Sequence, residues 1–201
     1  VAQKGLLVLE LRAEGRACHA AHARALGAPN ALRLLAQDLV RLDAVDLGPE
    51  HPLLGPVTLE PTVASGGSAR NAVPALATCV LDGRVNPDPG PAELVARLRA
   101  AVRGELRVLS DRLAPCQVDP AHPLVRAAQR ARPASPLVGS RGLSDQAFFA
   151  RAGVPAIKVG PGRTERSHTA DEFVLETEIL EGARFYEALA LGYRTEEGNE
   201  K

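Results

Sequence analysis

A single histidine, His168, lies in the stretch of this sequence whose position best suits ligand binding. The stretch covers residues 160–173; it follows an apolar run at 154–159 and precedes a long helical pattern. Such a junction lies at the carboxyl end of a strand, where ligands bind in open α/β sheets. His168 is therefore either a metal ligand or general base, or a histidine that only packs near a helix start. Since zinc takes three or four protein ligands, His168 alone does not define a metal site.

A second histidine, His19, follows Gly15 by four residues at the end of a predicted strand. Gly15 fits a turn or bulge, so His19 leaves the strand end in a fixed direction. Its side chain is either a hydrogen-bond donor that stabilises an oxyanion or a polar group at a strand end. His22 lies three residues further on, but a metal site made by these two histidines would lack a nearby third ligand.

An arginine and an asparagine lie in two further candidate motifs. Arg84 follows Asp82 by two residues on one face of a predicted strand. Arg84 either holds a carboxylate through two parallel hydrogen bonds or forms a surface ion pair that contributes little. Asn71 lies in a Gly-Gly loop at 66–74, which is either a hairpin connection or a ligand-contacting loop. This loop matches neither a phosphate-binding loop nor a dinucleotide fingerprint, so nucleotide binding is rejected.

Hydroxyl and thiol nucleophiles are poorly supported by their surroundings. Ser144 precedes a predicted helix, where a serine side chain commonly caps the first turn. No Gly-x-Ser-x-Gly motif surrounds it, which argues against a serine hydrolase. The three cysteines, Cys18, Cys79 and Cys116, are widely spaced and odd in number. We interpret them as small buried side chains rather than as disulfides or zinc ligands.

Composition excludes several classes of partner. The 24 basic residues balance the 24 acidic ones, so there is no electrostatic case for nucleic acid or an anionic membrane. Aromatic residues make up only 3%, which leaves few stacking surfaces for single strands. No apolar run approaches the roughly 20 residues of a membrane helix, and no signal peptide is visible. We therefore expect a cytoplasmic protein that binds neither nucleic acid nor membrane.

The first part of the chain has the pattern of a ferredoxin-like unit. Apolar alternation and helical periodicity predict the order strand, helix, strand, strand, helix, strand. The corresponding segments are 5–17, 28–42, 57–63, 75–85, 91–102 and 105–113. This order predicts a four-stranded antiparallel sheet covered by two helices.

The second part of the chain alternates helices with short apolar strands, which is typical of an α/β unit. Helices are predicted at 122–132, 144–152 and 172–193, and strands at 136–139 and 154–159. We place the boundary between the units so that the first covers residues 1–115 and the second 116–201. Two clear strands cannot make a covered sheet, so we expect further strands upstream of Val1. The sequence contains no Met, which fits a fragment, a processed product or a misplaced gene start.

Taken together, the motifs resemble the dinuclear-metal amidohydrolases that include acetylornithine deacetylase, succinyl-diaminopimelate desuccinylase, aminoacylase and carboxypeptidase G. Each motif alone is weak, but they follow one another in the order of that family. In the first unit they are Gly15-x-x-x-His19, Gly66-Gly67 through Asn71 to Pro74, and Asp82-x-Arg84-x-x-Pro87. In the second they are Gly142-x-Ser144-Asp145, Gly160-Pro161-Gly162 and His168-Thr169-x-Asp171-Glu172.

The resemblance implies a role for each histidine. His168 would be the last ligand of a two-metal site that holds zinc or cobalt. His19 would reach across a dimer interface and stabilise the tetrahedral intermediate in the partner's active site. The chemistry would be attack of a metal-activated water on an amide carbonyl, with a glutamate as general base.

The resemblance also implies substrate contacts. Asn71 and Arg84 would hold the carboxylate or acyl end of a small N-acyl amino acid. The backbone of Gly160 and Gly162, together with the loop that contains Ser144, would line the substrate pocket. The acyl group and the amino acid are left open, with acetylornithine deacetylase as the first expectation and the desuccinylase as the second.

One part of the family pattern does not occur in these residues. In the family the other metal ligands and the glutamate base precede the lid, which is the name we use for the first unit. Leu143 also stands where many members have threonine. We therefore expect this chain not to hydrolyse amides by itself and His168 to bind metal weakly. We also expect a homodimer formed through the lid, and the rival hypothesis is a non-catalytic dimerisation or binding module.

Overall fold

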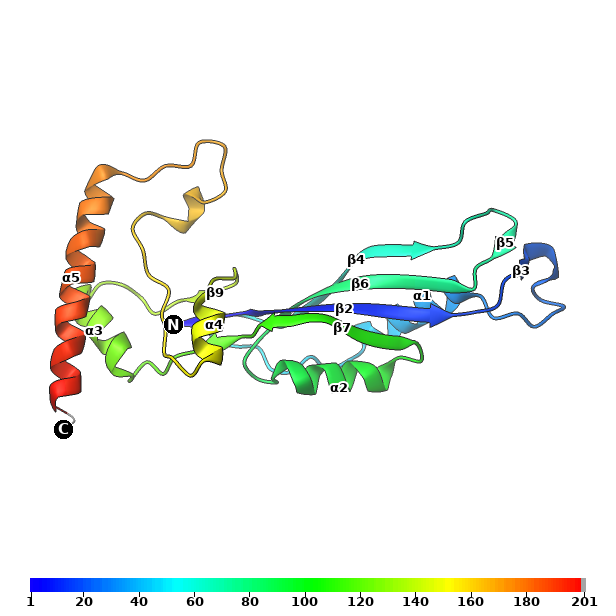
Figure 1. The fold of residues 1–201 in the computed structure, drawn as a ribbon, viewed down its shortest axis with the longest axis horizontal. Helices are drawn as coiled ribbons and strands as arrows, with labels where there is room; N and C mark the ends of the chain where they lie inside the picture. Colours follow the sequence, from blue (N-terminus) through cyan, green and yellow to red (C-terminus); the bar gives the residue numbers. More distant parts are fainter. Residues whose placement is uncertain (200–201) are drawn as a thin grey trace.

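Strand β2 (Gly5–Glu14) lies inside the main sheet of the structure. In the computed structural model, which describes residues 1–199, this sheet is antiparallel with the strand order β4-β6-β2-β7 (Figure 1). The other strands are β4 (Thr58–Gly66), β6 (Leu76–Val85) and β7 (Glu105–Leu113). Strands β2 and β6 pair without interruption, from Gly5 opposite Val85 to Glu14 opposite Leu76. Every lid strand predicted from the sequence is present.

Two helices, α1 (Ala31–Asp43) and α2 (Pro91–Ala101), cover one face of this sheet (Figure 1). Alternate residues of β2 are buried on that face, as the period of two along a strand requires. The side chains of both helices complete the same core, which includes Leu7, Leu9, Leu11, Leu35, Leu42, Leu81, Leu94 and Leu98. The ferredoxin-like lid predicted from the sequence is therefore confirmed.

A small two-stranded sheet lies beyond one end of the lid, at the far end of the molecule from α5 (Figure 1). It pairs β3 (Cys18–His19) with β5 (Ala72–Val73). The short helix η1 (Ala20–His22) follows β3 directly. We call this region, residues 18–22 together with 71–73, the lid tip.

The N-terminal residues join the lid to a second, three-stranded sheet. Its central strand is β1 (Ala2–Gln3), which pairs antiparallel with β8 (Cys116–Gln117) and parallel with β9 (Gly139–Ser140). Only Lys4 separates β1 from β2. One short stretch of backbone therefore belongs to both units.

Helices α3 (Pro123–Ala131), α4 (Gln146–Arg151) and α5 (Glu176–Asn199) accompany the second sheet. Helices α3 and α5 pack side by side (Figure 1). The His122 side chain caps α3 by accepting a hydrogen bond from Leu124 N at 3.1 Å, as expected for a helix start. Among the described helices none is both long and apolar enough to cross a membrane.

Three details of the second unit differ from the sequence predictions. The strand predicted at 154–159 does not form, since none of the described strands includes these residues. The strand predicted at 136–139 is limited to the two residues of β9. The last helix begins at Glu176 rather than near 172, and an irregular segment precedes it.

The second unit leaves much of its apolar surface uncovered. More than a third of each side chain is exposed in Val138, Phe148, Phe149, Val154, Phe173, Val174, Leu175, Ile179, Leu180 and Leu191. The lid core, by contrast, holds most of the fully buried large side chains. The two units therefore differ sharply in how completely their apolar faces are packed.

A buried carboxylate ties α1 to the connection between α2 and β7. Asp38 is 1% exposed and accepts hydrogen bonds from Gly104 N at 2.7 Å and Arg103 N at 3.1 Å. Arg41, one turn further along α1, donates to the same carboxylate. Each group around Asp38 would lose its partner if the carboxylate were removed.

We expect Asp38→Ala to lower the free energy of unfolding by about 2–4 kcal/mol, because it removes a buried carboxylate that accepts two backbone N–H bonds and pairs with Arg41. Urea denaturation followed by circular dichroism measures this change. Asp43→Ala, at an exposed position on the same helix, is the matched control and should change stability by about 0.5 kcal/mol or less. Equal effects of the two substitutions would contradict this account of Asp38.

Candidate functional site

The lid tip brings two of the sequence-predicted site residues together. His19 pairs with Ala72 across the small sheet, and Ala20 N donates to the carbonyl of Asn71 at 2.8 Å. Both His19 and Asn71 are exposed. Two segments that are distant in sequence therefore bring the exposed residues His19 and Asn71 together through their backbones.

The His19 ring has a defined orientation. Its Nδ1 accepts a hydrogen bond from Ala21 N at 3.2 Å, so in the neutral ring the proton lies on Nε2. This Nε2–H group is a donor on an exposed side chain, which suits contact with an oxygen of another molecule. The His22 ring centroid is 5.5 Å from that of His19.

Arg84 lies near the opposite end of the lid sheet from the tip. Its Nε donates to Asp82 Oδ1 at 2.7 Å and its Nη2 donates to Oδ2 at 3.1 Å. Both side chains are about one-third exposed. The eight-residue separation from Leu76 corresponds to about 26 Å along β6. Within one chain, Arg84 and the tip residue His19 therefore do not share a site.

Ser144 belongs to the junction between the units. Its hydroxyl donates to Gln3 Oε1, and its carbonyl accepts from Gln3 Nε2 at 3.4 Å. The residue in the capping position of α4 is Asp145, so the predicted capping role of Ser144 is displaced by one residue. The hydroxyl oxygen of Ser144 still accepts a weak hydrogen bond from Gln146 N at 3.4 Å.

The sequence analysis did not identify Gln3 and Lys4, which are buried polar residues at this junction. Gln3 is 0% and Lys4 3% exposed. The Lys4 ammonium donates to the carbonyl of Pro56. Burial lowers the pKa of Lys4, and nearby Arg141 and Arg84 lower it further. The available signal was a polar pair directly before the apolar strand pattern that begins at Gly5, because buried polar groups need partners from neighbouring segments.

His168 lies in an exposed loop between the short helix η2 (Thr164–Arg166) and α5. Its backbone has φ of 61°, and its N–H donates to Glu172 Oε2 at 3.1 Å. Gly162, with φ of 84°, makes the turn that leads into η2. The segment that leads into α5 lies at the end of the molecule away from the lid tip (Figure 1).

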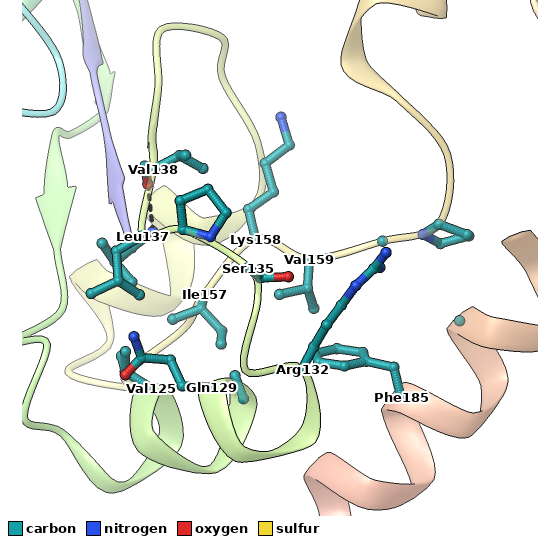
Figure 2. A pocket seen from close by; sticks show the side chains of 16 residues that line it. Val125, Gln129, Arg132, Ser135, Leu137, Val138, Ile157, Lys158, Val159 and Phe185 are labelled. Atoms are coloured by element: carbon teal, nitrogen blue, oxygen red, sulfur yellow. Dashed lines mark hydrogen bonds between the residues drawn. The ribbon is translucent and has the colours of Figure 1, made fainter.

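A pocket of about 200 Å³ lies between α3, α5 and the segment that leads to Gly160. Figure 2 shows its apolar side chains, among them Val125, Ile157, Val159 and Phe185, with Arg132 and Lys158 at its edge. Gly160 lines it, whereas Gly162, Ser144 and His168 do not. None of its lining residues is a histidine, cysteine, aspartate or glutamate, so the pocket offers no carboxylate, imidazole or thiolate to a metal.

The donor set of residues 1–199 does not by itself make a zinc or cobalt site. No three side chains of histidine, cysteine, aspartate or glutamate gather closely enough to hold a metal in this part of the chain. His51, which the sequence analysis did not consider, binds Gln117 through Nε2 at 3.0 Å. Cys79 and Cys116 are buried, and burial raises the pKa of both thiols, which opposes metal-binding thiolates.

Nearly the whole chain has the same fold as part of several solved structures. An aminopeptidase PepT from Bacillus cereus is 20% identical, with a TM-score of 0.76, over 96% of this chain and 53% of its own. A putative aminohydrolase from Staphylococcus aureus is 15% identical, with a TM-score of 0.71, over 94% of this chain and 52% of its own. An M20 family metallo-carboxypeptidase from Sulfolobus solfataricus is 18% identical, with a TM-score of 0.66, over 96% and 59%. The chain thus spans little more than half the length of these proteins, and identities this low support similarity of fold.

Comparison with protein families gives a more specific result. No curated protein sequence matches the chain. Residues 1–108 match the model of the M20 peptidase dimerisation domain, and this range contains the lid tip and nearly all of the lid sheet. This chain therefore belongs to the M20 peptidase dimerisation-domain family.

Proposed function

We propose that residues 1–115 form the dimerisation lid, and residues 116–201 the C-terminal part of the catalytic unit, of a metal-dependent amidohydrolase. The observation that carries this proposal is the family match over residues 1–108 together with a fold similarity that continues through the second unit. The neighbours named above are an aminopeptidase, an aminohydrolase and a carboxypeptidase. Hydrolysis of a carbon–nitrogen bond is the reaction that these names have in common, and we propose a linear amide as the bond that is cleaved.

The proposed substrate is a small N-acyl amino acid, with acetylornithine the first candidate and succinyl-diaminopimelate the second. Arg84 supports an acidic group on the substrate, because its guanidinium already holds the Asp82 carboxylate in a two-bond geometry. Lys4 and Arg141 add positive charge nearby. A substrate carboxylate would compete with Asp82 for the same donors.

The proposal gives His168 the role of a ligand to zinc or cobalt. One imidazole falls well short of the three or four protein ligands of a zinc site. We therefore expect the 201-residue chain on its own to bind either metal weakly and to show no amide hydrolysis. Gly160, Gly162 and Ser144 would contribute backbone or hydroxyl contacts to the substrate.

The proposed assembly is a homodimer that forms through α1 and β4. Leu32, Ala36 and Val40 are exposed at intervals of four residues and so form a stripe along α1. The stripe reaches the sheet edge, since a Cβ on Gly66 of β4 would lie 2.8 Å from Leu32 Cδ2. Val40 is 69% and Val63 of β4 63% exposed. Exposed apolar residues that continue from a helix onto an edge strand are typical of an interface between copies.

Such a dimer would give the lid tip a function. His19 and Asn71 lie far from Arg84 in their own chain, so they would serve the site of the partner. The exposed Nε2–H of His19 is the group that would donate to a developing oxyanion there.

A dimerisation module without catalytic activity is the second candidate. It is favoured by the end of the family match at residue 108 and by the lack of a metal-binding cluster within residues 1–199. The two candidates differ in what they require of Arg84 and His168, since a module needs neither.

The dimer interface can be tested at Val40. We expect Val40→Glu to weaken dimerisation by about 30-fold, because a charge would be buried at the contact. Sedimentation equilibrium measures the dissociation constant. Leu109→Glu, an exposed apolar position on the opposite edge strand β7, should leave it unchanged. A wild-type chain that is monomeric at micromolar concentration would contradict the proposed homodimer.

Substrate recognition can be tested at Arg84 without any turnover. We expect N-acetylornithine to bind the chain with a dissociation constant of about 1–10 mM, seen as NMR shifts around Arg84. Arg84→Ala should abolish the shifts. Arg107→Ala, which removes a similar arginine ion-paired with Glu105, is the control and should retain them. Equal binding by both variants would favour the non-catalytic module.

Metal binding can be tested by titrating zinc or cobalt into the purified chain and following it by calorimetry. We expect no stoichiometric binding tighter than about 10 μM and no difference between wild type and His168→Ala. Tight stoichiometric binding that is lost in His168→Ala would show that the chain supplies a more complete site than proposed.

A further inference from the structure

The backbone of His168 has a conformation that something must hold in place. With φ of 61°, it is the one non-glycine residue with positive φ in the described part of the chain. Histidine enters this left-handed region more readily than most residues, but such conformations persist only when surrounding contacts fix them. The loop around His168 is exposed to solvent, so general burial does not supply that constraint.

Arg166, two residues before His168, joins the loop to Phe173 and to the last helix. Its Nη1 donates to Glu178 Oε2 at 2.7 Å, and its guanidinium carbon lies 4.4 Å from the centroid of the Phe173 ring. The side chains of Arg166 and Glu178 are each only 19% exposed. The guanidinium of Arg166, which precedes His168, is therefore held by two residues that follow His168.

Glu178 anchors this contact to the last helix. The same Oε2 accepts from Leu175 N at 2.9 Å, which is the reciprocal half of a capping box at the start of α5. Two further bonds close the loop around His168. Thr169 Oγ1 donates to the Arg166 carbonyl at 2.8 Å, and Glu172 accepts from His168 N.

We infer that Arg166 is a positioning residue for His168, and that it acts through Glu178 and the Phe173 ring. That Arg166 holds the loop does not depend on the proposed function. Only the use of this contact in metal binding rests on the proposed role of His168 as a ligand. The contacts of Arg166 with Phe173 and Glu178, which we call the clamp, fix the position of the His168 backbone. They thereby also fix the direction in which its imidazole leaves the backbone. A histidine held before metal arrives loses less conformational freedom on binding.

The clamp is tested by NMR relaxation on the whole 201-residue chain without metal. We expect the backbone order parameters of residues 164–169 to fall from about 0.85 to below about 0.6 in Arg166→Ala. The chemical shifts of His168 should move at the same time. Thermal unfolding should change little, since the clamp lies outside the lid core. Arg184→Ala, an exposed arginine on α5, is the control and should alter neither the order parameters nor the chemical shifts of His168.

Two further variants separate the clamp from helix capping. Glu178→Gln keeps an acceptor for Leu175 N but removes the charge, so it should loosen the loop without shortening α5. Arg166→Lys keeps the charge but loses the planar fork, and should restore order only partly. Unchanged order at His168 in both Arg166→Ala and Glu178→Gln would overturn the inference. Because no metal is present, this result is independent of whether His168 binds one.

Discussion

The position of the second unit on the lid depends on the short strand β1, on the backbone of Lys4 and on the buried side chain of Gln3. Backbone pairing places β1 between β8 and β9, and the chain then continues directly into β2. Lys4 N donates to the Ser140 carbonyl at 3.0 Å, while its side chain donates to Pro56 and Gln3 bonds Ser144. Since burying these groups without partners would be costly, any large shift of the units would break several bonds at once.

This junction also fixes which candidate residues can meet. Ser144 and Arg84 lie near it, whereas His19 and Asn71 lie beyond the other end of the same strands. A stiff antiparallel sheet cannot fold back to bring these groups together. A site that uses all of them must therefore draw the tip from another copy, and a two-fold axis would supply two equivalent sites. The length of the lid sheet is thus an argument for assembly that is independent of any exposed apolar patch.

The sequence predicted the lid well because its signals are local. Leu7, Leu9 and Leu11 alternate with partly exposed residues, and Leu35 and Leu42 recur on one face of α1, so each element carries its own pattern. The segment at 154–159 has the composition of a strand, but a strand also needs a neighbour, which composition does not report. The buried junction depends on contacts between distant residues, and the positive φ of His168 depends on side-chain contacts that no hydrophobic pattern reports. Candidate residues could thus be chosen from the sequence, but their grouping could not.

The two units differ in what fixes their geometry. The lid buries its apolar face under α1 and α2, so its geometry is set by a packed core. In the second unit the segment before Gly160 has no ladder partner among the described residues, and the apolar side chains on α4 and α5 are partly uncovered. The His168 loop therefore takes its geometry from the α5 side, through Glu178, rather than from a sheet. A helix cap joined to an ion pair can hold a short loop in one conformation where no sheet edge is available to do so.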